Sequence, residues 1–168
     1  AHPEAQIRLA RTGVCATPDA QSDDRGVLAQ PVNDHAPVMF AAVPGDRLDA
    51  VGRAMARARH AGASAELLTD ASPERLLRDA DVVVSLPWPP HGEPPTSALA
   101  AMAAGKPMIV FESAASAGWP ALDPQSWQPR GLTTDAPIVV SIDSRDEEHS
   151  LMLAIRRLSA EPALRAKI

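Results

Sequence analysis

The residues best suited to bind a ligand lie in one short loop, His91–Ser97 (HGEPPTS), between an apolar run and a stretch of small residues. The two prolines of this loop have no amide hydrogen, so the first free amides of the expected helix belong to Thr96, Ser97 and Ala98. Amides at a helix amino terminus attract anions, and the two hydroxyls add donors. The loop therefore predicts a phosphate site, although Thr96 or Ser97 acting only as a helix cap would leave the same pattern.

The same loop carries groups for sugar recognition, because His91 and Glu93 can hydrogen-bond the hydroxyls of a sugar or ribose. The sequence motifs of other kinds of ligand site are absent. The Gly-Lys pair at 105–106 is followed by proline, so the P-loop motif is absent, and no Gly-x-Gly-x-x-Gly follows an expected strand. The histidines are scattered, and the single cysteine, Cys15, excludes a zinc site built on cysteine pairs. Neither a metal nor a nicotinamide or flavin cofactor is predicted.

Composition limits the class of protein further. A net charge of -5 and an aromatic fraction of 3% argue against nucleic-acid binding, which needs a basic face or stacking platforms. No run approaches the ~20 apolar residues of a transmembrane segment. With 168 residues we expect a single domain over residues 1–168, in which the pattern defines residues 1–36 poorly. One cysteine favours a reducing compartment, so we expect a cytoplasmic protein, free or peripheral to a membrane.

Apolar runs alternate with helical patterns along most of the chain. The expected strands are Val38–Val43, Ala65–Leu68, Asp81–Leu86, Met108–Phe111 and Pro137–Ile142, with one more within Gln6–Ala16. The expected helices are Gly26–Gln30, a helix capped by Asp46 and ending near His60 before Gly62, Pro73–Arg78 capped by Ser72, Thr96–Ala104, and a last one opened by Asp146 with a final turn over Leu164–Ile168. Residues 113–131 show no periodic pattern and are expected to form a long loop. The sum predicts an α/β fold: a Rossmann-like, doubly wound parallel sheet of five to six strands with helices on both faces.

The segment Asp79–Val110 resembles the donor-binding domain of GT-B fold glycosyltransferases, closest to the retaining family 4 type. That family reads strand, proline, a glutamate-containing loop with glycine, then Glu-Ala-Met-Ala-x-Gly-x-Pro and another strand. This chain reads DADVVVSLPW, then HGEPPTSAL, then AMAAGKPMIV. The final stretch, Asp146–Arg165, is similar to the closing helix pair of the family. The resemblance covers most of Val38–Ile168.

The resemblance implies a carboxyl-terminal domain that binds a nucleotide-diphosphate sugar as donor substrate, without a metal. A separate amino-terminal acceptor-binding domain, absent from this chain, would be its partner, and the isolated chain would be inactive. The residues implied as donor contacts are Gly92, Glu93, Thr96 and Ser97 in the loop with His91, Glu112 and Ser113 after the next strand, and either Arg25-Gly26 or Gly45 with Arg47 for the diphosphate.

Two positions of the family pattern differ in this chain. The glutamate that holds the donor ribose in the family is Ala100 here, and the arginine that accompanies the Arg25-Gly26 motif has no counterpart. These differences leave a second hypothesis open, a non-catalytic Rossmann-like module for binding or assembly that is derived from such a domain. A small α/β enzyme that binds a sugar phosphate is a third and less favoured hypothesis, because no catalytic constellation is present.

Overall fold

The computed structural model describes residues 36–43, 45–69, 72–89, 92–130 and 135–168. They belong to one compact unit, Asn33–Ile168. The candidate residues Arg25, Gly26 and His91 lie outside the described residues, as do the strand and the helix expected within Gln6–Gln30. For this first part of the chain the single domain over residues 1–168 stays a prediction.

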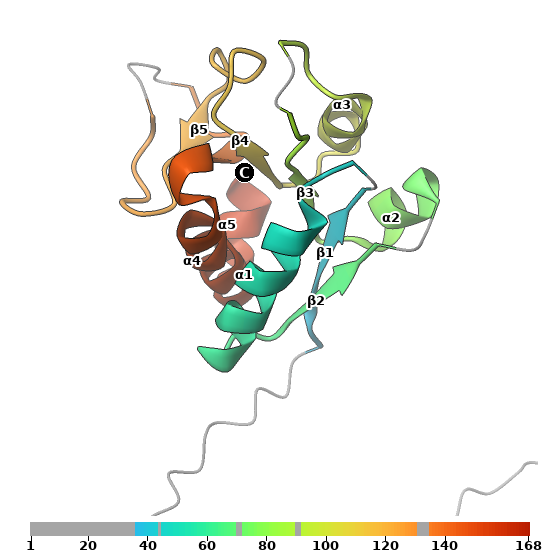
Figure 1. Cartoon of the computed structure of the whole chain (residues 1–168), viewed down its shortest axis with the longest axis vertical. Helices are drawn as coiled ribbons and strands as arrows, with labels where there is room; N and C mark the ends of the chain where they lie inside the picture. Colours follow the sequence, from blue (N-terminus) through green and yellow to red (C-terminus); the bar gives the residue numbers. More distant parts are fainter. Residues whose placement is uncertain (1–35, 44, 70–71, 90–91, 131–134) are drawn as a thin grey trace, which may run out of the picture. The chain divides into compact units, whose positions relative to one another are not determined.

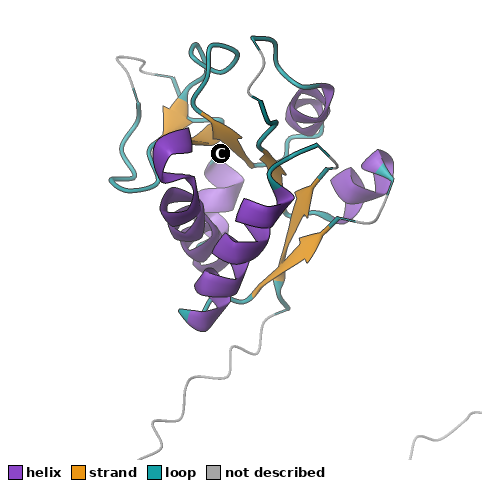
Figure 2. Ribbon diagram, in the orientation of Figure 1, coloured by secondary structure: helices purple, strands orange, loops and turns teal. Residues whose placement is uncertain are grey.

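Six parallel strands form the sheet of this unit (Figure 2). They are β1 (Val38–Ala42), β2 (Ala65–Leu68), β3 (Val82–Ser85), β4 (Met108–Phe111), β5 (Ala121–Leu122) and β6 (Val139–Ile142). Their spatial order is β2-β1-β3-β4-β6-β5, and every neighbouring pair is parallel. The inner strands read as continuous apolar runs because both faces of the sheet are covered. The predicted α/β, Rossmann-like fold is confirmed.

Helices cover the two faces in different pairs. On one face α1 (Leu48–His60) packs beside α4 (Glu147–Ala160), as Figure 1 shows, and on the other lie α2 (Pro73–Asp79) and α3 (Thr96–Ala103). Two core layers result, of which the first is built around Phe40 of β1 and Leu151 of α4 and the second around Leu76 of α2. A 3-10 turn, Ser144–Asp146, precedes α4, and α5 (Pro162–Lys167) follows it.

Several predicted helix ends are confirmed by their hydrogen bonds. The hydroxyl of Ser72 accepts a bond from the Arg75 amide at 3.4 Å and caps α2. Gly62 has a φ of +90° and follows the C-cap residue of α1, and Gly105 has a φ of +62° and follows the C-cap residue of α3, where the left-handed conformation favours glycine. At the second of these ends the Lys106 amide donates to the Ala101 carbonyl at 3.0 Å, which closes the helix.

Three predictions of local structure are wrong. Asp46 does not cap α1: the N-cap is Arg47, which makes no side-chain cap bond, and the Asp46 carboxylate points elsewhere. The stretch predicted as a loop after β4 contains the short strand β5, because its backbone pairs with β6. The last helical turn begins at Pro162 rather than Leu164, since proline fits the first position of a helix.

The strand order reverses between β1 and β3. The chain leaves β1 for β2 on one side, then returns to β3 on the other side of β1. In open α/β sheets, ligands bind beyond the carboxyl ends of the strands at such a point of reversal. The loops that follow β1, β3 and β4 all lie at this edge, and most of the candidate residues are in these loops.

Candidate functional site

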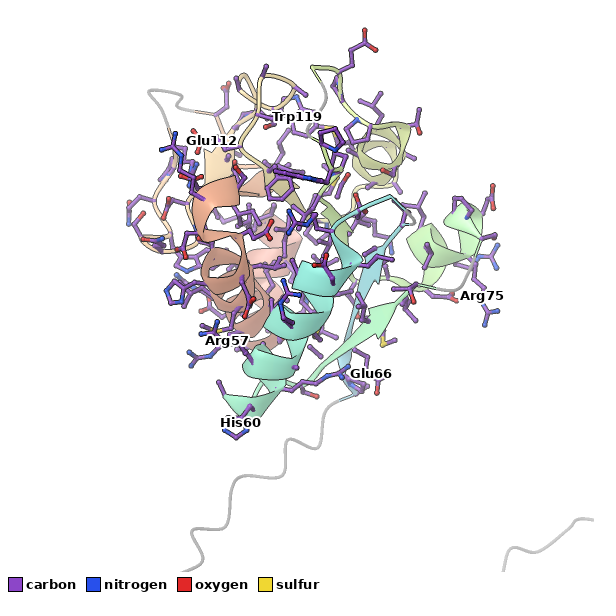
Figure 3. All side chains as sticks on the ribbon, viewed as in Figure 1. Arg57, His60, Glu66, Arg75, Glu112 and Trp119 are labelled. Carbon is purple, nitrogen blue, oxygen red and sulfur yellow. The ribbon has the colours of Figure 1, made fainter. Side chains whose placement is uncertain are left out.

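A small pocket lies at the carboxyl ends of β3 and β4, beside the start of α3. Its walls are formed by residues of these two strands, of the loop before α3 and of the loop after β4: Ser85, Pro87, Glu93, Pro95, Ala98, Val110, Phe111, Ser113, Ala115, Ser116 and Trp119. In Figure 3 the labelled Trp119 and Glu112 lie at this edge, while His60 lies at the opposite one. The pocket thus unites two predicted site residues, Glu93 and Ser113, from loops that follow consecutive strands.

The pocket has the size of a solvent molecule. Its cavity volume is about 20 Å³, close to the ~10–15 Å³ that one buried water requires. Only one small group of a ligand fits inside, so any larger ligand would lie across its mouth. Glu93 is exposed at this mouth and Ser113 is half-buried, so both side chains face the space that such a ligand would occupy.

The amino terminus of α3 opens toward the same edge and has no side-chain cap. The N-cap is Pro95, so capping by Thr96 or Ser97, the simpler interpretation of the sequence, is not what the structure has. The amides of Ala98 and Leu99 donate to the Pro95 carbonyl at 3.0 and 3.2 Å, whereas those of Thr96 and Ser97 have no acceptor among the described residues. The first turn carries no acidic residue. Two free amides and the positive end of the helix dipole therefore remain available for an anion.

The serine hydroxyls nearby differ in how firmly they are held. Ser97 is half-buried, and its Oγ lies 3.5 Å from Oγ of Ser85 at the end of β3. The buried Ser116 hydroxyl donates to the Phe111 carbonyl at 2.6 Å and accepts from the Ser113 amide at 3.1 Å. Ser116 thereby fixes the loop after β4, and this loop presents Ser113 to the pocket.

Glu112 does not line the pocket. Its carboxylate pairs with Arg130, which also binds Asp123 at 2.9 Å, and so ties the end of β4 to the turn that follows β5. Gly92 is exposed, and a side chain added there would meet no other atom within 4 Å. The structure thus brings Glu93, Thr96, Ser97 and Ser113 to one place and turns Glu112 away from it.

The carboxylate of Asp46 joins the ends of β1 and β3 at the point of strand reversal. One oxygen accepts from the Val43 amide at 3.1 Å, and the other accepts from the Leu86 amide at 2.8 Å. Gly45, with a φ of +100°, lets the chain turn back so that this short side chain reaches both amides. The crevice that could bind a foreign anion therefore already holds an anion of the chain itself, which sequence reasoning missed.

Arg47, the candidate cation for a diphosphate, is engaged within the protein. It forms an ion pair with Glu147 at 2.7 Å, and its guanidinium lies 4.8 Å from the centroid of the Trp88 ring. The second oxygen of Glu147 is buried and has no hydrogen-bond partner. Gly45 and Arg47 are thus part of a structural cluster on the loop after β1, and neither residue lines the pocket beside α3.

The burial of Asp46 predicts a distinct pH dependence of stability. Desolvation raises the pKa of Asp46 from 3.8 to about 6, although the bonds from Val43 and Leu86 act in the opposite direction. Since the folded protein binds this proton more tightly than the unfolded chain, its contribution to stability grows as pH falls through about 6 and is complete near the unfolded pKa. Relative to Asp46→Asn, the wild type should gain about 2–3 kcal/mol of unfolding free energy between pH 7 and pH 4.

Denaturant unfolding of both proteins at several pH values measures this difference. The subtraction removes the titration of the other carboxylates, which is common to both proteins. A difference that stays constant with pH, or that grows toward alkaline pH, would show that Asp46 is not desolvated as described.

Comparisons of the chain with models of known protein families, with curated proteins and with solved structures find no match. Among the described residues no group of three or more histidines, cysteines or acids is placed to hold a metal ion. No helix in the described part of the chain has the length and apolar character needed to cross a membrane.

Proposed function

We propose that this chain is the carboxyl-terminal donor-binding domain of a glycosyltransferase, which binds a nucleotide-diphosphate sugar and transfers the sugar to an acceptor. The observation that carries the proposal is the uncapped amino terminus of α3 beside Glu93 and Ser113, at the edge where parallel sheets bind ligands. The resemblance of Asp79–Val110 to such domains supports the same assignment. An amino-terminal acceptor-binding domain is the proposed partner, and the cytoplasm or the cytoplasmic face of a membrane is the proposed compartment.

Each part of the donor has a suitable place at this site. The diphosphate is assigned to the free amides of Thr96 and Ser97, where the helix dipole stabilises negative charge. The sugar is assigned to the pocket mouth, where the Glu93 carboxylate accepts hydrogen bonds from hydroxyl groups and the Ser113 hydroxyl donates or accepts them. The same amides would stabilise the charge that develops on the departing diphosphate during transfer.

A second candidate function, a non-catalytic binding or assembly module, is favoured by one observation. The cations and carboxylates that would complete a donor site are absent or engaged: Arg47 is paired with Glu147, and Ala100 in α3 offers no carboxylate for a ribose. A module of this kind would keep the fold and bind no nucleotide.

Calorimetric titration of the chain with UDP, GDP, ADP, TDP and their common sugars separates the two candidates. At least one nucleoside diphosphate should bind saturably, whereas its parent nucleoside should bind at least about tenfold more weakly, because it lacks the charged hydrogen bonds of the diphosphate. If no nucleotide binds at millimolar concentration, the donor-binding function is rejected in favour of the non-catalytic module.

Two glutamates offer a matched pair of variants for the same titration. Glu93→Gln removes a carboxylate at the pocket mouth, whereas Glu112→Gln removes one that is paired with Arg130 outside the pocket. Glu93→Gln should lower the affinity for the nucleotide sugar by about tenfold, since a charged hydrogen bond contributes about 1.5–3 kcal/mol. The affinity for the nucleoside diphosphate, which has no sugar at this position, should not change. Glu112→Gln should change neither. Equal effects of the two variants would remove Glu93 from the sugar site.

A further inference from the structure

Trp88 is an exposed aromatic ring at the point of strand reversal. Its side chain is 53% exposed, and Trp88 and Leu99 are the large hydrophobic residues that the described part of the chain exposes. Trp88 follows β3 by a few residues and thus lies at the edge that carries the proposed donor site. An exposed indole at a binding edge offers an aromatic face on which a flat ligand can stack.

The ring is held in a fixed position although it is exposed. The Trp88 amide donates to the Gly45 carbonyl at 3.4 Å, and the Arg47 amide donates to the Leu86 carbonyl at 3.0 Å, so the loops after β1 and β3 are bonded to each other. The Arg47 guanidinium stacks on the ring, and Phe111 meets it edge-on with centroids 6.3 Å apart. A ring that is already ordered loses little entropy when a flat ligand stacks on it.

Trp88 is continuous with the pocket beside α3. Phe111, which contacts the Trp88 ring, is part of the pocket wall, and so is Pro87, its neighbour in the chain. A ligand bound at the free amides of α3 can therefore extend along this wall onto the exposed part of the Trp88 ring.

The charges around Trp88 decide which part of a ligand fits there. The amides of Val43 and Leu86 already donate to Asp46, and Glu147 neutralises Arg47, so these described groups leave no net positive charge for a phosphate. A sugar needs hydrogen-bonding partners, and the pocket mouth offers these at Glu93 and Ser113. A flat, uncharged aromatic group is what remains, and stacking on tryptophan suits every nucleobase because each has a π-face.

We propose that Trp88 is the stacking platform for the nucleobase of the donor nucleotide. This inference rests on the proposed function, and it gives the bound donor a direction, with the base over Trp88, the diphosphate at the start of α3 and the sugar at the pocket mouth. Because stacking does not read the edge of a base, Trp88 contributes affinity without selecting among bases.

Binding of UDP and of ADP to the whole chain, followed by calorimetry and by tryptophan fluorescence, tests the platform. Trp88→Ala should lower the affinity for both nucleotides by a similar factor, roughly 5- to 150-fold, which corresponds to about 1–3 kcal/mol per stacked base. Trp88→Phe should restore most of the affinity. Nucleotides should quench the fluorescence of the wild type, and most of this quenching should be missing in Trp88→Phe.

Trp127 supplies the matched control, because it is also stacked by an arginine, Arg157 at 4.6 Å, and lies in a different pocket. Trp127→Phe should leave affinity and quenching unchanged. Pyrophosphate, which has no base, should bind Trp88→Ala as it binds the wild type, and equal weakening of pyrophosphate and UDP would mean that Trp88 acts only through the fold. Nucleotide binding that is insensitive to Trp88→Ala would overturn the platform and leave the donor-binding function standing. Absence of nucleotide binding to the wild type would overturn both.

Discussion

Replacing Thr96 by glutamate is expected to weaken nucleotide binding by at least about tenfold without loss of stability. Thr96 is exposed at the first position of α3, and its amide has no acceptor among the described residues. The first turn of this helix has neither an acid nor a side-chain cap. A carboxylate placed there interacts favourably with the helix dipole and stabilises the folded protein by about 0.3–1 kcal/mol. It also repels a diphosphate at the same amides, so the affinity for nucleoside diphosphates should fall by at least about tenfold, or about 1.4 kcal/mol.

Thr96→Gln is the control for this substitution, because it has nearly the same shape and carries no charge. It should bind nucleotides within about threefold of the wild type, a difference below 1 kcal/mol. Thermal unfolding of the two variants should show that Thr96→Glu is the more stable one, most clearly at low ionic strength, where charges are least screened. Opposite changes in stability and affinity would be difficult to explain by damage to the fold. A glutamate variant that binds UDP as the wild type does would exclude the start of α3 as the diphosphate site.

Asp46→Ala should be the more damaging change for the fold itself. The carboxylate accepts bonds from two amides that belong to different strand ends, those of Val43 and Leu86. Alanine leaves both donors without an acceptor, and each buried, unsatisfied group costs about 1–3 kcal/mol. Relief of the desolvation of Asp46 offsets part of this cost, so we expect a loss of about 2–4 kcal/mol in unfolding free energy at pH 7, measured by urea unfolding.

Two further variants test whether the loss comes from these bonds. Asp46→Asn keeps one acceptor oxygen and should lose about half as much as alanine does. Asp49→Ala removes an exposed acid from the first turn of α1, where its carboxylate pairs with Arg53 at 3.3 Å, and should change stability far less than Asp46→Ala does, because exposed ion pairs contribute little. If Asp46→Ala were as mild as Asp49→Ala, the carboxylate would not be the link between β1 and β3.

The sheet and its helices could be predicted because their signals are local. The apolar runs at Val38, Val82 and Met108 are buried on both faces, and each therefore reads as a strand without reference to the rest of the chain. Gly62 and Gly105 mark helix ends through their own backbone conformations. The strand β5 could not be predicted, since two residues form no pattern and the strand exists only through its pairing with β6.

Features of the candidate site could likewise be predicted where their signals are local, and could not be predicted where they depend on residues distant in the sequence. The resemblance to donor-binding domains implies that Glu93 and Ser113 lie together. Both line one pocket in the structure, because each follows a strand of one parallel sheet and the carboxyl ends of such strands share an edge. The pairing of Arg47 with Glu147 joins residues 100 positions apart, and no local pattern indicates it. The expectation that Asp46 caps α1 fails for a related reason. An acid before a helix usually caps it, but here the folded loops offer this carboxylate two other amides.

Amide NMR of the whole chain, during a titration with the nucleoside diphosphate that binds best, shows directly whether the ligand binds at the start of α3. The amide signals of Thr96 and Ser97 should move most, saturate with the same dissociation constant as calorimetry gives, and move far less with the parent nucleoside. Trp127 and Arg156 line the pocket between the ends of α1 and α4. If the signals around these residues move instead, the nucleotide does not bind at the start of α3.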